Sequence, residues 1–380
     1  MSEQIMNKSD NISETNEELA EERASEASVA PEGADVAEGT PDGAAAAAAP
    51  DGAVALDYGE NILEVRHLKK YFPAEKNFWG KPVSFLKAVD DVSFAIKRGQ
   101  TLGIVGESGC GKTTLGRTIL RLNSSSGGEI IFEGRDIANL KPSELRPLRT
   151  RMQIVFQDPY SSLPPRYTIG DTISEAAMIH HIVPKSELRD YTLHIMHQCG
   201  LQDYYYDRYP HEFSGGQRQR ICIARALAVR PEFIVCDEPV SALDVSIQAQ
   251  IINLLTDLQR KNGLTYMFIS HDLSVVEHIS DRVGVMYLGS LVEIGDKKDI
   301  FGDPEHPYTQ ALLSAIPVPD PHYKRNRIIL EGDIPSPVNP PSGCKFHTRC
   351  PKATERCSEE VPELRDLGNG HLAACHFCGR

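Results

Sequence analysis

The sequence lacks a membrane-spanning segment and an export signal. No stretch of it approaches the roughly 18 consecutive apolar residues that a transmembrane helix requires. The beginning of the chain also lacks the basic residues followed by an apolar run that mark a signal peptide. If the protein works at a membrane, we therefore expect it to bind there as a peripheral subunit.

The first 60 residues have few aromatic side chains and almost no bases. They contain 15 Asp or Glu and 2 Lys or Arg, whereas the rest of the chain contains 38 of each sign. The formal net charge of −13 therefore belongs to this segment, which is rich in Glu and Ala. Such a composition cannot bury enough apolar surface to fold alone. We predict a disordered acidic tail over residues 1–60, acting as a solvated spacer, and a neutral folded body after it.

The folded body has room for two or three folding units, because the chain has 380 residues of which 41% are hydrophobic. Its nine cysteines are unevenly spread. The four in the middle of the chain are expected to be free thiols in a reducing compartment, and the five near the end need a separate explanation. The two groups are Cys110, Cys199, Cys222 and Cys236, and then Cys344, Cys350, Cys357, Cys375 and Cys378.

Hydrophobic periodicity predicts an α/β fold. Residues 62–65 and 92–96 alternate apolar and polar side chains, as strands of an antiparallel sheet do, and a segment with Pro and Gly at 73–82 separates them. Residues 160–210 have mostly helical patterns, including 186–199. The segments after them alternate as βαβ units do, which implies a parallel sheet covered by helices. They are the helices 218–229 and 247–261 and the strands 233–236, 266–269 and 283–286.

A phosphate-binding loop follows the strand predicted over residues 102–105. The run GESGCGKT at 106–113 satisfies the P-loop pattern, and apolar residues then recur at helical spacing. Backbone N–H groups of such a loop wrap phosphates. Lys112 is expected to reach the β- and γ-phosphates, and the Thr113 hydroxyl to ligate Mg²⁺.

Two carboxylates end the buried strand at 233–236. Adjacent strand residues point to opposite sides, so Asp237 can hold Mg²⁺ through water while Glu238 polarises the attacking water. His271 follows the strand at 266–269. We expect it at the same carboxyl edge, within reach of the γ-phosphate.

The run SGGQ at 214–217 lies between the P-loop and these carboxylates. It begins a predicted helix and offers backbone amides and a hydroxyl to an anion. Taken alone, it is also compatible with a simple helix cap.

With these motifs in order, residues 62–317 resemble the ATP-binding subunit of an ABC transporter. The resemblance implies that Gln157, in VFQDP at 155–159, senses Mg²⁺ and the membrane partner, and that residues 241–244 cross a dimer interface. It implies that Tyr71 stacks on adenine, with the adjacent Phe72 as the alternative. It also implies that the SGGQ run contacts the γ-phosphate held by the other subunit. Phe213 stands where Leu is commoner in the family.

The predicted site is thus a set of three overlapping groups. The catalytic residues are Glu238, His271 and Gln157, and the Mg²⁺ ligands are Thr113, Gln157 and Asp237. The ATP-binding residues are Tyr71, Gly106, Ser108, Gly109, Gly111, Lys112, Thr113, Thr114, Ser214, Gly215, Gly216 and Gln217.

The end of the chain, residues 305–378, is similar to the C-terminal extension of dipeptide and oligopeptide importer ATPases. Four thiolates in a loop-rich segment suit an iron-sulfur cluster or zinc, and the resemblance favours a [4Fe-4S] cluster. Its ligands would be Cys344, Cys350, Cys357 and Cys375. Several alternatives remain open: Cys378 in place of Cys375, a mixed zinc site that includes His347, His371 or His376, disulfides, and unliganded thiols.

The expected architecture is α/β with three parts. An ABC-type P-loop domain spans 61–317, with a mixed sheet core, an antiparallel β subdomain and an inserted helical subdomain at about 158–230. It follows the 1–60 tail and precedes a small irregular Cys-rich module at 318–380.

The resemblance implies a peripheral ATPase on the cytoplasmic face of the inner membrane that drives import of di- or oligopeptides. Its partners would be a second ATPase, favoured as a paralogue in a heterodimer, two membrane permeases and, indirectly, an extracytoplasmic binding protein, with no nucleic acid. Related importers carry nickel, glutathione or oligosaccharide. Two alternatives belong to a different functional class. One is a soluble ABC ATPase that acts in DNA repair or translation, and the other is a regulatory binding module.

Overall fold

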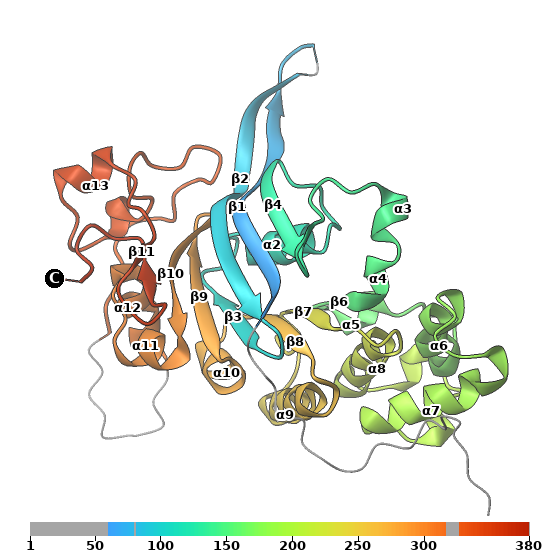
Figure 1. The fold of residues 1–380 in the computed structure, drawn as a ribbon. Helices are drawn as coiled ribbons and strands as arrows, with labels where there is room; N and C mark the ends of the chain where they lie inside the picture. The colour runs from blue at the N-terminus through green and yellow to red at the C-terminus, as the bar shows by residue number, and fades with distance from the viewer. Residues whose placement is uncertain (1–59, 80, 317–326, 380) are drawn as a thin grey trace, which may run out of the picture. The chain divides into compact units, whose positions relative to one another are not determined.

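The structure is a computed structural model that describes residues 60–79, 81–316 and 327–379 (Figure 1). All of these residues belong to one compact unit. The tail predicted over residues 1–60 lies outside the described residues, apart from Glu60.

The described chain forms two sheets. One is a four-stranded antiparallel sheet of order β2-β1-β4-β5, and the other is an eight-stranded mixed sheet of order β11-β12-β10-β9-β3-β8-β7-β6. The strands are β1 (Asn61–Lys76), β2 (Pro82–Lys97), β3 (Thr101–Val105), β4 (Gly127–Phe132), β5 (Arg135–Asp136), β6 (Met152–Val155), β7 (Phe233–Asp237), β8 (Thr265–Ile269), β9 (Arg282–Tyr287), β10 (Ser290–Asp296), β11 (Arg365–Asp366) and β12 (Leu372–Ala373).

Five strands of the mixed sheet run parallel: β6, β7, β8, β3 and β9. Strands β10, β12 and β11 continue the sheet in antiparallel pairs. Every residue of β3, β7 and β8 is buried, because both faces of a parallel sheet are covered. The carboxyl ends of these three strands meet at one edge, where the predicted site residues follow them.

Two cores lie on the two faces of the mixed sheet. Helix α2 (Lys112–Ile119) packs between the two sheets, where Leu115 and Ile119 join apolar residues of β1, β2 and β8. On the other face lie α8 (Gly215–Leu227), α9 (Val245–Asn262) and α10 (Leu273–Ile279), which pack on β8 and β9. Figure 1 shows α9 and α10 on the side of the sheet away from the β1–β2 ribbon.

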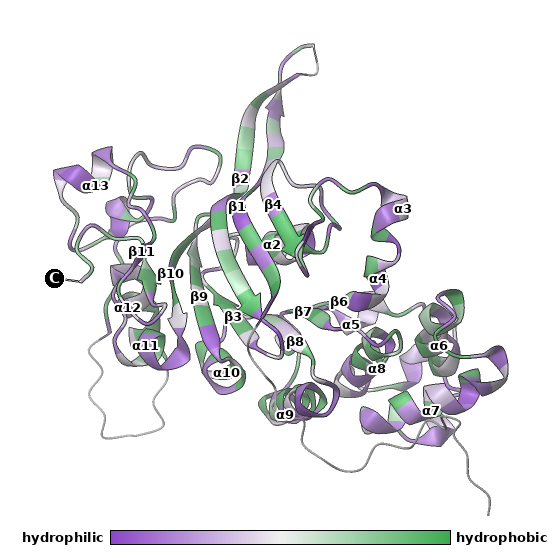
Figure 2. Cartoon of the chain, in the orientation of Figure 1, coloured by the Kyte–Doolittle hydropathy of each residue, from purple (hydrophilic) through white to green (hydrophobic). Residues whose placement is uncertain are grey.

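A group of helices precedes α8, within the region predicted to be helical. The bounds are α5 (Pro159–Ser162), α6 (Ile169–Ile179) and α7 (Leu188–Gln198), with short 3₁₀ turns at Lys185–Glu187, Asp203–Tyr205 and Pro210–Glu212. In Figure 2 the helices carry both hydrophilic and hydrophobic residues, as expected where one side packs on a core and the other faces water.

The remaining helices are short or lie near the end of the described chain. They are α3 (Pro142–Leu145), α4 (Leu148–Arg151), α11 (Lys297–Gly302), α12 (Pro307–Ser314) and α13 (Glu355–Glu359), together with a 3₁₀ turn η4 (His347–Arg349).

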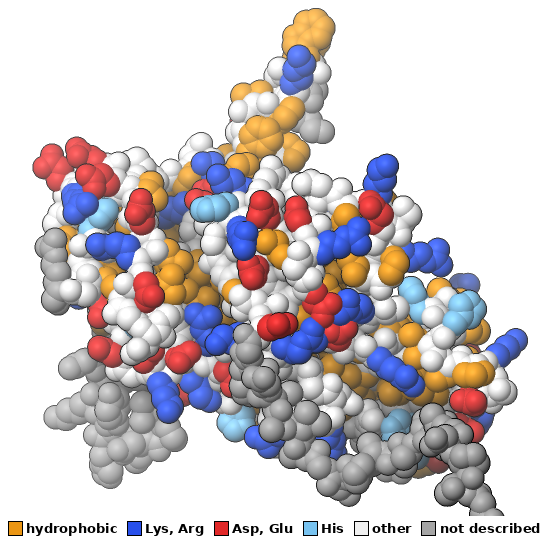
Figure 3. Space-filling view, viewed as in Figure 1, with side chains coloured by type: hydrophobic (Ala, Val, Ile, Leu, Met, Phe, Trp, Pro, Cys, Tyr) orange, Lys and Arg blue, Asp and Glu red, His pale blue; other side chains and the backbone are white. Residues whose placement is uncertain are grey.

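The segment at 73–82, predicted to separate the first two strands, is strand at 73–76 and at Pro82, so the interruption between β1 and β2 is shorter than predicted. β1 and β2 form one long ribbon in which Pro73 pairs with Phe85, and the register shifts between Pro73 and Glu75. A proline is tolerated there because the outer part of a two-stranded ribbon needs fewer N–H donors, and bulges absorb the irregularity. Figure 3 shows hydrophobic side chains at the tip of the ribbon, where Phe78 and Trp79 are exposed.

The C-terminal module, residues 327–379, extends the mixed sheet. Strand β12 pairs with β10 through Ala373 opposite Glu293, and the Ala374 N–H donates to the Val292 carbonyl at 2.8 Å. His371 Nε2 also lies 2.8 Å from Oε1 of the fully buried Glu293. The last part of the chain is therefore joined to the mixed sheet of the P-loop domain by backbone and side-chain contacts.

In the part of the chain that the structure describes, no helix has the length and hydrophobicity needed to cross a membrane.

Candidate nucleotide-binding and catalytic site

The P-loop leads from β3 into α2 through a glycine that no other residue replaces easily. Gly111 has φ of 108°, and a Cβ added there would lie 2.0 Å from the Ala88 carbonyl oxygen. As the N-cap of α2, Gly111 supplies no side-chain hydrogen bond to the first helical amides. No side chain at the N-cap thus competes with an anionic ligand for these amides.

A cavity of about 670 Å³ opens at this loop. It is lined by Phe72, Leu86, Ala88, Ser108, Gly109, Gly111, Lys112, Thr113, Thr114, Gln157, Glu238 and His271. The structure thus brings together residues from β1, the P-loop, the segment after β6 and the ends of β7 and β8. Its glycines and amides at one end and apolar side chains at the other suit a nucleoside triphosphate.

Lys112 is held at the floor of the cavity. Its side-chain ammonium donates to the carbonyls of Gly106 at 2.8 Å and Glu107 at 3.1 Å, and the residue is only 5% exposed. These contacts orient a buried cation inside the P-loop, where phosphate oxygens can replace the carbonyls as acceptors.

Thr113 and Asp237 form the polar pair expected to hold Mg²⁺. The Thr113 hydroxyl donates to Asp237 Oδ1 at 2.7 Å. Asp237 Oδ2 is buried and accepts no hydrogen bond within the described residues, and the Arg117 guanidinium lies 3.6 Å from it. Burial raises the pKa of the Asp237 carboxyl, against the opposing effects of Thr113 and Arg117. An orphaned carboxylate oxygen beside a hydroxyl fits a hard divalent cation.

The three predicted catalytic residues converge on one oxygen. Glu238 Oε2 accepts a hydrogen bond from Gln157 Nε2 at 3.0 Å and lies 3.2 Å from His271 Nδ1. Glu238 itself has φ of 48°, an unusual value for a residue with a side chain, so its surroundings hold it in a strained conformation. Strain of this kind gathers at functional sites.

The two candidate adenine contacts lie differently. Phe72 lines the cavity. Tyr71, the residue that the sequence favoured, instead donates its hydroxyl hydrogen bond to Asp90 Oδ1 and is not among the lining residues. The side chains of neighbouring strand residues point to opposite faces of the sheet, so only one of these two side chains can line the cavity.

The SGGQ run lies outside this cavity. The Ser214 hydroxyl accepts from the Gln217 N–H, and Gln217 Oε1 accepts from the Ser214 N–H, which makes a capping box at the start of α8. Gly215 and Gly216 follow, and a Cβ on Gly216 would meet Ile247 Cγ2 at 2.5 Å. The chain therefore presents this helix start on a different surface from its own P-loop cavity.

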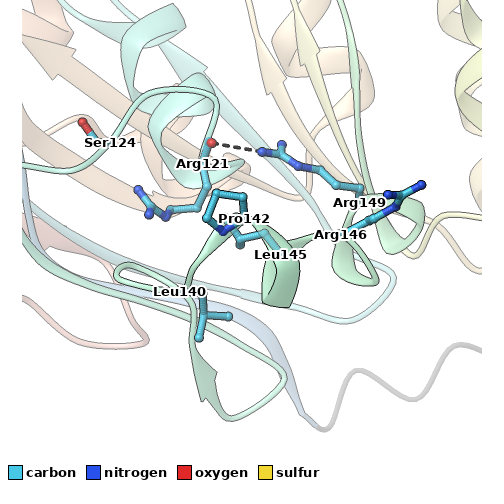
Figure 4. Close-up of a pocket in the computed structure, with 7 residues that line it drawn as sticks. All are labelled: Arg121, Ser124, Leu140, Pro142, Leu145, Arg146 and Arg149. Carbon is cyan, nitrogen blue, oxygen red and sulfur yellow. Dashed lines mark hydrogen bonds between the residues drawn. The ribbon is translucent and has the colours of Figure 1, made fainter.

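A second cavity, of about 450 Å³, lies between the end of α2 and helices α3 and α4 (Figure 4). It is lined by Arg121, Ser124, Leu140, Pro142, Leu145, Arg146 and Arg149. Arg149 donates to the carbonyls of Leu120 and Arg121, and the Arg121 Nε donates to the Ile137 carbonyl. These two guanidinium groups hold the chain around α2 together, and none of the predicted site residues lies here.

The predicted metal site near the C-terminus is not supported. Within residues 60–79, 81–316 and 327–379, no group of three or more His, Cys, Asp or Glu side chains is placed to hold a metal ion. The nine cysteines are all free thiols, so the disulfide alternative is not supported either. Burial, together with the nearby Cys357, Cys350 and Cys375, raises the pKa of the Cys344 thiol to about 11. The thiols are thus neighbours, but they do not converge on one point.

Sequence reasoning missed two contacts that join the C-terminal module to the site. Arg349 forms an ion pair with Glu107 of the P-loop, and Lys345 forms one with Asp90. The available signal was the presence of two bases, Lys345 and Arg349, between Cys344 and Cys350.

Comparison with known proteins places this fold and site in a class. Residues 89–241 match the family described as ABC transporter. Among solved structures, the dimeric ATP-binding cassette MJ0796 bound to ADP and Pi matches with a TM-score of 0.56 and 26% identity, over 62% of this chain and 98% of that one. CbiO1 from Clostridium perfringens matches with a TM-score of 0.55 and 28% identity, over 64% and 91%. The predicted ABC-type P-loop fold is confirmed, and the chain is an ABC ATPase.

Two further findings narrow the class. Residues 292–357 match the family described as the C-terminal region of oligopeptide/dipeptide transporters. The oligopeptide transport ATP-binding protein AppF of Bacillus subtilis is 54% identical over 321 residues, which are 84% of this chain and 98% of AppF. The chain therefore belongs to the family of ATP-binding proteins of peptide ABC transporters, as the sequence predicted.

Proposed function

We propose that the chain binds ATP and Mg²⁺ in the P-loop cavity and hydrolyses ATP with Glu238 as the general base. The observation that carries this proposal is the convergence of Gln157 and His271 on Glu238 Oε2, at 3.0 and 3.2 Å, in a cavity that also contains Lys112. A bound Mg²⁺ supplies charge neutralisation for the phosphates.

The two oxygens of the Glu238 carboxylate have different contacts, and we assign them different roles. Gln157 and His271 hold Oε2, whereas no hydrogen bond reaches Oε1 from the described residues. Oε1 is therefore the oxygen that accepts a proton from the attacking water. Thr113 and Asp237 hold the metal, Lys112 and the α2 amides hold the phosphates, and Phe72 rather than Tyr71 stacks on adenine.

We further propose that the SGGQ run completes the cavity of a partner subunit. Ser214, Gly215, Gly216 and Gln217 lie off this chain's own cavity, and the similar MJ0796 cassette is dimeric. The free hydroxyl hydrogen of Ser214 and the amides of the two glycines are donors for a γ-phosphate held opposite.

We propose that ATP hydrolysis drives import of di- or oligopeptides, because the similar protein AppF is an oligopeptide transport ATP-binding protein. The chain would act as a peripheral subunit on the cytoplasmic membrane face with a paralogous ATPase, two permeases and an extracytoplasmic binding protein. Co-expression with the permeases tests this proposal. Recovery of the chain only in the cytosolic fraction would overturn it.

The Glu238→Gln substitution tests the catalytic proposal. ATP binding should persist, because the cavity is preserved, while hydrolysis falls by about 100-fold or more. Glu277→Gln on α10 is the matched control, since Glu277 is exposed and away from the cavity. Undiminished hydrolysis by Glu238→Gln would show that another group is the base.

For the cysteine module we keep the [4Fe-4S] cluster as a hypothesis, with zinc second, on the family match at 292–357 and the closeness of the four thiols. Holding a metal would require those thiols to move together. Anaerobic purification followed by iron, sulfide and zinc analysis decides it. Stoichiometric zinc without sulfide would identify a zinc site. Absence of both iron and zinc would reject the cluster and the zinc hypotheses alike.

A further inference from the structure

The loop at 344–350 of the C-terminal module lies against the wall that supports the P-loop. Phe346 is 1% exposed and packs on Tyr287 of β9 and Tyr308 of α12, with ring centroids 5.3 Å apart in both pairs. The Tyr308 hydroxyl in turn accepts a hydrogen bond from the Glu107 N–H of the P-loop at 2.9 Å. The module therefore reaches the phosphate-binding backbone through one layer of aromatic side chains.

Arg349 reaches the P-loop directly. Its two terminal nitrogens donate to the two carboxylate oxygens of Glu107, at 2.9 and 3.1 Å, in the bidentate arrangement that is strongest for this pair. The side chains of Arg349 and Glu107 are 7% and 24% exposed, so water screens the pair weakly. The carbonyl of the same Glu107 accepts from Lys112.

The negative charge of Glu107 explains how this ion pair can affect ATP binding. Glu107 is a carboxylate within a loop that binds phosphates, and an unpaired negative charge there repels ATP. Arg349 neutralises that charge from a part of the chain 242 residues away.

Lys345, in the same loop, makes a second charged contact, with Asp90 of β2. Its ammonium donates to Asp90 Oδ2 at 2.8 Å, to Ser290 Oγ at 2.6 Å and to the Leu288 carbonyl at 3.0 Å. Asp90 lies two residues after Ala88, a residue that lines the cavity and whose carbonyl packs on Gly111. The 344–350 loop thus contacts two supports of the nucleotide cavity.

We propose that the 344–350 loop positions the ATP cavity, and that Arg349 sets its affinity for ATP by neutralising Glu107. Arg349 and Lys345 are positioning residues, because they act through Glu107 and Asp90. By linkage, ATP binding must stabilise the loop by the same factor by which the loop strengthens ATP binding. The inference rests on the proposed ATP cavity.

Charge removal on each side of the pair tests the proposal in the full-length chain. Arg349→Gln should raise the Kd for ATP about tenfold or more, while kcat in the assembled transporter changes less than about twofold. Glu107→Gln should leave ATP affinity equal or higher, and the double variant should recover wild-type affinity within about threefold. A purely structural role predicts weaker binding in both single variants and no recovery.

Arg356→Gln is the matched control. Arg356 is in the same module and pairs with Glu360 at the surface, with both side chains more than half exposed. It should leave the Kd unchanged. If Arg349→Gln does not fold, the Glu107→Gln result alone decides, since a loss of ATP affinity there would overturn the proposal.

A second measurement reads the linkage in the opposite direction. In the Glu238→Gln background, which retains ATP, hydrogen exchange of the amides at 344–350 should slow when ATP is added. The slowing should disappear with Arg349→Gln. Unchanged exchange in the presence of bound ATP would overturn the linkage, whereas absence of ATP binding by the parent chain would instead refute the proposed function.

Discussion

Helices α2 and α8 both have glycine at their N-terminus, as the N-cap in α2 and in the first turn in α8, and they present their first amides differently. Helix α2 has Gly111 as its N-cap, with no side-chain cap, and opens onto the cavity. Helix α8 has Ser214 as its N-cap and a complete capping box with Gln217, away from the cavity. The N-terminus of α2 is open to a ligand in this chain's own cavity, whereas the N-terminus of α8 is capped by its own side chains and does not line that cavity.

The largest expected effect is the loss of ATP binding when the N-terminus of α2 is changed. Lys112→Ala should weaken ATP binding by about 100-fold or more, because it removes the buried cation of the P-loop. Equilibrium binding of a fluorescent ATP analogue to the isolated chain measures it. Retained affinity would mean that α2 is not the phosphate site.

Ser214→Ala tests the α8 side. The isolated chain should bind ATP normally and lose about 1 kcal/mol of its free energy of unfolding, because the cap is lost. ATP hydrolysis by the assembled transporter should fall far more, since the partner's cavity loses a donor. Weaker ATP binding by the isolated chain would break the distinction between the two helix starts.

Gly216→Ala asks whether that glycine serves packing as well. The added Cβ would lie 2.5 Å from Ile247 Cγ2, so we expect a destabilisation of about 1–3 kcal/mol, measured by chemical unfolding. Gly302→Ala is the control, because a Cβ there meets no atom within 4 Å. Equal stability of the two variants would show that Ile247 of α9 moves aside at little energetic cost.

The smallest effect concerns a carboxylate that belongs to neither helix start. Hydrogen bonding to Arg151 lowers the pKa of Glu232 from 4.5 to about 2. Ionised Glu232 thus stabilises the fold fully above pH 4.5, and this contribution is lost as the pH falls toward 2.

Between pH 6 and pH 3, the melting temperature of the wild type should fall by about 1–4 °C more than that of Glu232→Gln. Parallel melting profiles would show that this ion pair adds nothing.

The features that could be predicted from the sequence depend mainly on residues that lie close together in the chain. The P-loop, the α8 start and the carboxylates after β7 depend on residues close together in the chain, and the convergence of Gln157, Glu238 and His271 follows from parallel strands that end at one edge. The length of the β1–β2 ribbon was missed because prolines argue against strands except at edges. The Arg349–Glu107 pair joins residues 242 positions apart, which no local pattern encodes.

The pairing of β12 with β10 has a consequence for biosynthesis. Residues 372–373 leave the ribosome after the whole ATPase core, so the nascent chain holds β10 as an unpaired sheet edge until these two residues have emerged. A chain that stops before His371 would keep that edge exposed and lack the His371 partner of Glu293. Truncation before this point therefore turns β10 from an internal strand of the sheet into an edge strand that can pair with other chains.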